Sequence, residues 1–84
     1  MSQFDKLLER IVHLENNLRF EELRKVLESY GYTMRSPSGG SSHMTFRKHG
    51  HPPITIPRHE PIKKVYVLLV REIVEQEEQN NEQT

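Results

Sequence analysis

Apolar residues recur at helical spacing in two stretches near the N-terminus. Ser2 and Asp5 form a capping-box-like start to the first predicted helix, whose apolar positions are Phe4, Leu7, Leu8, Ile11 and Leu14. The second predicted helix runs from Phe20 to Tyr30, with apolar residues three and four positions apart. Gly31 follows where a glycine commonly ends a helix in a left-handed conformation. The pattern therefore predicts two helices before any strand.

The middle of the chain changes to short runs separated by turn residues. Three strands are predicted there, over residues 32–35, 42–48 and 54–56. In the second run, two apolar side chains alternate with three polar ones, so that Met44 and Phe46 face one way and His43, Thr45 and Arg47 face the other. Pro57 closes the third run. Turns this short between the runs indicate a three-stranded antiparallel meander.

A third amphipathic stretch begins after Pro61 and is expected to end at Glu75 or Gln76. Its apolar surface is broad, with one stripe and a flank formed by Ile62, Tyr66, Leu69, Ile73, Val65, Val67, Val70 and Val74. This breadth favours burial between the sheet and the first helices, and contact with a protein partner is the alternative. The order α-α-β-β-β-α predicts an α+β fold, a small two-layer domain whose three-stranded antiparallel sheet packs against helices.

Composition narrows the classes of function. The 84-residue chain contains no cysteine, which excludes a disulfide framework, a thiolate metal site and a cysteine nucleophile. The longest apolar run, residues 65–70, is far shorter than the roughly 18–20 residues that a membrane helix needs. The N-terminus lacks the pattern of a signal peptide. We therefore expect a cytoplasmic protein with no membrane partner.

A net charge of zero conceals an uneven distribution along the chain. Residues 35–66 contain six basic side chains and one acidic side chain, a local charge of +5. The preceding segment, residues 1–34, carries −1, and the following one, residues 67–84, carries −4. A locally positive surface attracts phosphate whatever the global charge. The alternative is a charged surface that serves solubility only.

The segment from Gly39 to Arg47 contains residue types suited to phosphate chemistry. A glycine-rich turn lets the backbone approach a phosphate closely. An imidazole, with an unperturbed pKa of ~6.5, exchanges a proton near neutrality, so His43 can act as a general base. Arg47 and Lys48 can stabilise charge on a phosphate. These are the requirements of RNA cleavage by the ribose 2′-hydroxyl, although the spacing also fits an exposed histidine without a catalytic role.

The other histidines support weaker interpretations. His49 and His51 flank a glycine, but no third ligand stands at a plausible spacing, so a pair of turn histidines is favoured over a metal site. A serine–histidine hydrolase is set aside because no nucleophile-elbow pattern is present. Arg58 and His59 end the third strand, where they are either linker residues or neighbours of His43.

Several motifs follow one another in a recognisable order. They are a helix that ends in Leu27–Tyr32, a Gly-Ser-His-type strand start, an Ile-Pro-Arg-His strand end, and a final helix. The segments concerned are 18–23, 27–32, 40–47, 54–59 and the helix after Ile62. This ordered set resembles the HicA toxins, also called YcfA-like mRNA interferases. The resemblance covers about residues 18–75. We expect one HicA-like domain over residues 1–76. The N-terminal helix at 1–16 and a polar tail at 77–84, which is expected to be disordered, extend beyond the minimal domain of the family.

The resemblance also implies a fold, an activity and a site. The expected fold is like that of double-stranded RNA-binding domains, and the expected activity is ribosome- and metal-independent cleavage of mRNA, without a cofactor and neutralised by a HicB-type antitoxin. The catalytic histidine of the family falls on His43. The motif reads Gly-Ser-Ser-His here, so either Gly40 or Ser41 takes the place of the glycine. The RNA-binding candidates are Arg35, Gly40, Ser42, Arg47, Lys48, Arg58, His59 and Lys64.

Three hypotheses follow in order of preference. The first is an endoribonuclease toxin in which His43 acts as general acid or base. The second is a non-catalytic RNA-binding module of the same fold, since recognition of RNA shape needs only basic and polar surface groups. The third is a protein-interaction domain in which the broad last helix docks a partner. Cleavage of RNA would favour the first hypothesis, and binding of RNA without cleavage would favour the second. Failure to bind any RNA would favour the third.

Overall fold

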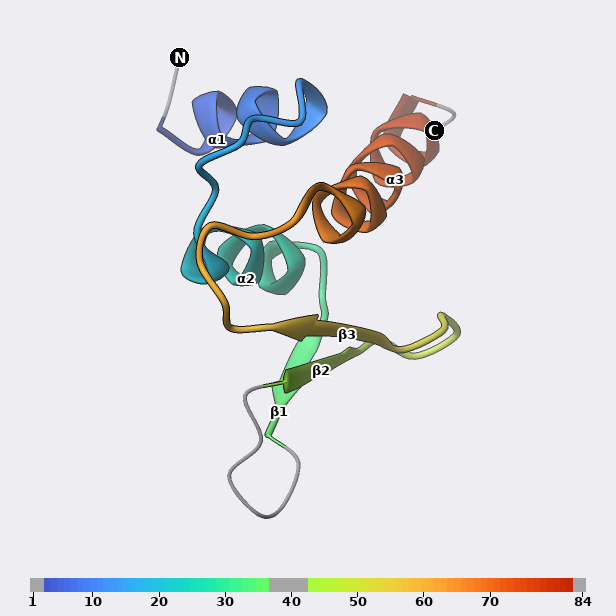
Figure 1. The fold of residues 1–84 in the computed structure, drawn as a ribbon. Coiled ribbons are helices and arrows are strands. Elements are labelled where there is room, and N and C mark those ends of the chain that lie inside the picture. The colour runs from blue at the N-terminus through green and yellow to red at the C-terminus, as the bar shows by residue number, and fades with distance from the viewer. Residues whose placement is uncertain (1–2, 37–42, 83–84) are drawn as a thin grey trace.

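A computed structural model describes residues 3–36 and 43–82 of the chain. All three helices lie on one side of a three-stranded antiparallel sheet (Figure 1). The fold is therefore the predicted α+β arrangement, in the predicted order α-α-β-β-β-α. Its elements are α1 (Gln3–Val12), α2 (Phe20–Ser29), β1 (Thr33–Arg35), β2 (His43–Arg47), β3 (Ile54–Pro57) and α3 (Lys64–Glu82).

Local signals explain both ends of α2. At its start the backbone N–H of Arg19 donates to the carboxylate of Glu22 at 2.9 Å, which satisfies a donor that the helix leaves unpaired. At its end Gly31 has φ +98°, and the N–H of Tyr32 donates back to the carbonyl of Leu27 at 3.1 Å. This is the Schellman arrangement, in which a residue without Cβ adopts the left-handed conformation. The predicted glycine cap is confirmed.

The sheet is a meander in which β2 lies between β1 and β3. Met34 pairs with Phe46 across the first ladder, and Met44 pairs with Ile56 across the second. Met44, Phe46 and Ile56 are buried beneath the helices, whereas His43 and Arg47 are exposed on the opposite face. The predicted alternation along the second strand is therefore confirmed, with strand ends that differ from the prediction by one residue.

One apolar core joins the two layers. Phe46 is fully buried at its centre, and its ring centroid lies 6.0 Å from that of Phe20 on α2. α1 adds Leu7 and Ile11 to the same core and packs against α3. Among the residues whose burial is described, no polar or charged side chain is buried. The core is thus held by apolar burial, which stabilises by about 25 cal/mol per Å² removed from water.

The structure corrects the prediction for the last helix in two respects. α3 begins at Lys64 and continues to Glu82, beyond the predicted end at Glu75 or Gln76, so residues 77–82 of the expected polar tail are helical. One reason is a tertiary contact, because Lys48 Nζ lies 2.8 Å from the carboxylate of Glu77. The side chains of both partners are more than three-quarters buried. The spacing of apolar residues along a helix does not predict an ion pair with a residue far away in the sequence.

The inward face of α3 also differs from the predicted stripe. Val67, Val70 and Val74 are the residues that the core buries. Of the predicted stripe, Ile62 is buried, Tyr66 and Ile73 are half-buried, and Leu69 is exposed. Val65 and Leu68 are exposed as well. The prediction that the broad apolar surface is buried holds for one side of the helix only, because α1 and α2 pack against that side.

Candidate nucleic-acid interface

The face of the sheet that points away from the helices is polar and accessible. It carries alternate residues from each strand, which the described register brings together as Thr33, Arg35, His43, Thr45, Arg47 and Thr55. The hydroxyl oxygens of Thr45 and Thr55 lie 3.4 Å apart across the β2–β3 ladder. Guanidinium, imidazole and hydroxyl groups on one open surface provide hydrogen-bond donors for an anionic ligand.

Three of the predicted site residues meet at one end of this sheet, and a fourth, Arg35, lies diagonally beside them. His43 opens β2 and is paired with Pro57, the last residue of β3. Arg58 and His59 follow Pro57 directly, so the meander brings the strand end predicted for them to the start of β2. Arg35 ends β1 opposite Thr45, a diagonal neighbour of His43 at roughly 7–8 Å between Cα atoms. His43, Arg58 and His59 are exposed, as is Arg35.

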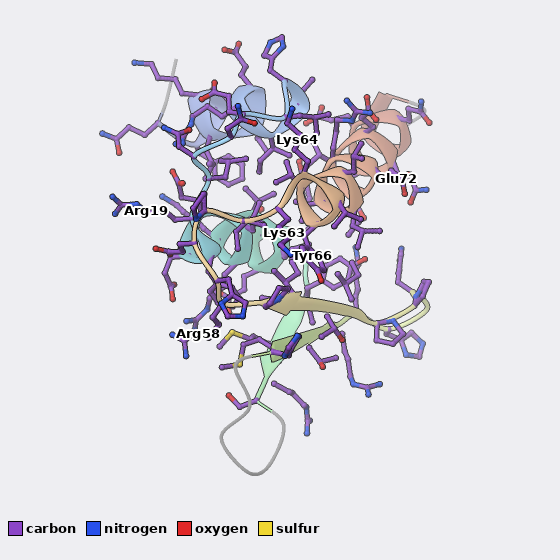
Figure 2. All side chains as sticks on the ribbon, in the orientation of Figure 1. Arg19, Arg58, Lys63, Lys64, Tyr66 and Glu72 are labelled. Atoms are coloured by element: carbon purple, nitrogen blue, oxygen red, sulfur yellow. The ribbon has the colours of Figure 1, made fainter. Side chains whose placement is uncertain are left out.

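The segment after β3 is held against the start of α2. The guanidinium carbon of Arg58 lies 5.4 Å from the ring centroid of Phe20, a cation–π contact. The carboxylate of Glu60 accepts a hydrogen bond from the backbone N–H of Phe20 at 3.2 Å. Figure 2 shows Arg58 beside the end of β3, with Arg19 above it at the start of α2. These long-range contacts, which sequence spacing did not reveal, fix the backbone next to His43.

Two predicted phosphate contacts lie away from this end of the sheet. Lys48 follows β2 and turns toward the helices, where it pairs with Glu77 and lies 5.7 Å from the ring centroid of Tyr32. Burial raises the pKa of the Tyr32 phenol, while the Lys48 ammonium lowers it and Glu77 raises it further. Lys64 lies in the first turn of α3 on the helical side of the molecule (Figure 2). The structure therefore does not group these lysines with His43.

The remaining predicted residues lie at the other end of the sheet or outside the described part. Arg47 ends β2, four residues from His43 on the same face. The turn that follows places His49 and His51 beside it. Their spacing predicted a pair of turn histidines, and both do lie in this turn. Gly40 and Ser42 fall in 37–42, outside the described residues.

The described part of the chain contains neither a cluster of metal ligands nor a helix that could span a membrane. Within 3–36 and 43–82, no three histidine, cysteine or acidic side chains gather closely enough to hold a metal ion. None of the helices in the same ranges is long and apolar enough to cross a bilayer. The described polar side chains on the open face of the sheet are those of arginine, histidine and threonine.

Comparison with known proteins gives one decisive match. A family model described as the HicA toxin of bacterial toxin-antitoxin matches residues 20–76, more than half of the chain. The chain belongs to the HicA toxin family. No curated protein and no solved structure matches it. Membership gives the protein the role of the toxin in a bacterial toxin–antitoxin system, and an antitoxin is its implied partner.

The HicA match begins at the first residue of α2 and includes the whole sheet. It therefore contains every exposed arginine and histidine of the candidate site. α1 precedes the matched region, and in this HicA toxin it is joined to the rest through Arg10, which donates a hydrogen bond to Glu22 on α2. Arg71 of α3 donates to the carbonyl oxygen of Val12 at 3.4 Å. The additional helix is thus packed onto the matched domain.

Proposed function

We propose that this HicA toxin is a metal-independent endoribonuclease of mRNA in which His43 is the general acid or base. The observation that carries the proposal is the register of the sheet, because the pairing of His43 with Pro57 brings the exposed imidazole beside Arg58, and the pairing of Arg35 with Thr45 makes Arg35 a diagonal neighbour of His43. An imidazole beside guanidinium groups is the combination that transfer of a phosphodiester requires. Family membership supports the same reaction class.

The reaction proceeds by attack within the RNA itself. His43 accepts the proton of a ribose 2′-hydroxyl, whose oxygen forms a bond to the adjacent phosphorus. The bond from phosphorus to the 5′-oxygen of the next nucleotide breaks, and this oxygen takes a proton from a second donor, either solvent or the neighbouring His59. The products are a 2′,3′-cyclic phosphate and a free 5′-hydroxyl. RNA supplies its own nucleophile, so the scheme needs neither a metal ion nor a cofactor.

Arginine stabilises the charge that develops during this attack. The pentavalent phosphorus carries additional negative charge on its non-bridging oxygens, and a planar guanidinium donates two parallel hydrogen bonds to such a group. Arg35 shares the open face with His43, which makes it the nearer candidate for this contact. Arg58 is held over Phe20 at the same end of the sheet, and there it can bind a neighbouring phosphate.

Cleavage in the presence of a chelator tests this proposal. The purified toxin is expected to cut a 5′-labelled single-stranded RNA at the same rate with and without excess EDTA. It is expected to leave 2′,3′-cyclic phosphate ends and to spare a DNA of the same sequence, which lacks the 2′-hydroxyl. Loss of cleavage in EDTA, or cleavage of the DNA control, would contradict the proposed chemistry. Binding of RNA without cleavage would instead favour a non-catalytic RNA-binding module.

The antitoxin is proposed to be of the HicB type and to cover the basic end of the sheet. A toxin that acts on mRNA in the cytoplasm must be blocked in its own cell, and an acidic partner surface complements His43, Arg35 and Arg58. In the inhibited complex, modification of His43 by diethyl pyrocarbonate is expected to slow at least tenfold, as read from peptide masses, while His13 on the far layer reacts as before. An inhibited complex in which His43 reacts at its original rate would exclude this surface.

A further inference from the structure

A shallow depression on the open sheet face, beside Arg47, has basic walls. Those walls include Arg35, Arg47, His49 and His51, together with Thr33, Lys48 and Pro53. None of the described residues that line it is acidic. Other depressions on the described surface contain carboxylates, such as Glu22 and Glu60 at the start of α2 or Glu72 on α3. This depression is therefore suited to an anion.

The strand register places Arg35 and Arg47 on the same face of the sheet as His43. His43 and Arg47 are four residues apart on the same face of β2, a separation of roughly 13 Å at about 3.3 Å per residue. Arg35 pairs with Thr45, the residue midway between them. It is consequently a diagonal neighbour of both, at about 7–8 Å between Cα atoms. The three basic positions follow the length of β2, with Arg35 offset onto the neighbouring strand β1, and are called the row below.

The turn beyond Arg47 adds flat rings to the edge of the depression. The ring of His51 lies edge-on to Tyr32, with 6.2 Å between centroids, and its Nδ1 is 3.1 Å from the carbonyl oxygen of His49. These contacts set the orientation of the His51 ring. Unpaired bases of single-stranded RNA stack on histidine and other aromatic rings, whereas bases in a duplex are not accessible for such stacking. The site thus combines a phosphate contact with a surface for a base.

We propose that the depression at Arg47 is a subsite for a flanking phosphate and an unpaired base of single-stranded RNA. The proposal rests on the proposed function, since it assumes that the scissile phosphate lies at His43. The RNA strand then runs over the sheet along the row from His43 past Arg35 to Arg47. The guanidinium of Arg47 binds a phosphate of this RNA that is not cleaved. The hydroxyls of Thr45 and Thr55 lie beneath the strand between the two ends.

The test compares short and long oligonucleotides that cannot be cleaved. Fully 2′-O-methylated RNAs of two and eight nucleotides are titrated against wild type and Arg47→Gln at several salt concentrations. Lys25→Gln, which removes an exposed charge from α2, is the matched control. The eightmer is expected to bind Arg47→Gln about 5–10-fold more weakly, with a slope of log K against log salt reduced by about 0.7, because one phosphate contact is lost. The dinucleotide, which cannot span the row, is expected to bind both proteins equally.

Several results would overturn the subsite. Among them are an eightmer affinity unchanged in Arg47→Gln, an equal loss for the dinucleotide, the same loss in Lys25→Gln, and failure of the wild type to bind the eightmer. Because these RNAs lack a free 2′-hydroxyl, the measurement does not depend on catalysis. If the length-dependent effect of Arg47 is seen but unmodified RNA is not cut, the subsite stands and the proposed nuclease activity fails.

Discussion

Replacing His43 with alanine is expected to reduce the rate of RNA cleavage by about 10²–10⁴-fold, the usual contribution of a general acid or base. The imidazole is the group proposed to take the proton from the 2′-hydroxyl, and alanine leaves no group at that position to do so. The fold is expected to remain intact, because His43 is exposed at the start of β2 and the core residues Met44 and Phe46 are unaffected. Substitutions at such surface positions usually change the free energy of unfolding by within about 0.5 kcal/mol.

Single-turnover cleavage of a labelled RNA, measured beside thermal unfolding, gives both readouts for this variant. His13→Ala is the matched control, because His13 is also exposed but lies just after α1 on the far layer. It is expected to cleave at the wild-type rate. His59→Ala tests whether His59 is the donor of the second proton. If solvent can replace His59, the cleavage rate is expected to fall less in this variant than in His43→Ala. A His43→Ala protein that is folded and cleaves at more than half the wild-type rate would rule out His43 as the catalytic base.

Replacing Phe46 with alanine is expected to lower the free energy of unfolding by about 3–5 kcal/mol. The Phe46 side chain is fully buried on the helical face of the central strand, and it contacts Phe20 of α2 across the interface between the layers. Alanine leaves a cavity there that the surrounding side chains fill only in part. The loss is a large share of the roughly 5–15 kcal/mol by which small domains are stable.

Urea denaturation, monitored by circular dichroism, measures this change in the free energy of unfolding. Phe46→Leu retains most of the buried volume and is expected to lose less than half as much free energy, which keeps the test informative if the alanine variant does not fold. The control is Thr45→Ala, one position away on the open face, where the change in unfolding free energy is expected to stay within about 0.5 kcal/mol. Equal losses at positions 45 and 46 would contradict the assignment of the two faces.

The hydrophobic and polar pattern was sufficient for most of the fold. Alternation over residues 43–47 predicted which side chains of β2 face the helices, and Gly31 predicted the end of α2. These features depend on backbone geometry that repeats every two or every 3.6 residues, so a short window of sequence contains the information. The same alternation predicted that His43 and Arg47 share the solvent-facing side.

Contacts between distant segments decided the rest of the candidate site. Spacing alone left Arg58 and His59 either in a linker or near His43, and the pairing of His43 with Pro57 places them at the same end of the sheet. Lys48, a phosphate candidate by its position next to Arg47, is instead paired with Glu77 of α3.

The sequence by itself therefore determined the elements, their order and the two faces of the central strand. It also placed the catalytic candidate His43 on the polar face of that strand. Only the tertiary structure decided which basic residues accompany His43, where α3 ends, and that Arg35 lies midway between His43 and Arg47. The physical reason is the range of the interactions involved. Periodicity is set by the local backbone, whereas strand register and the ion pair of Lys48 with Glu77 depend on packing between segments far apart in the chain.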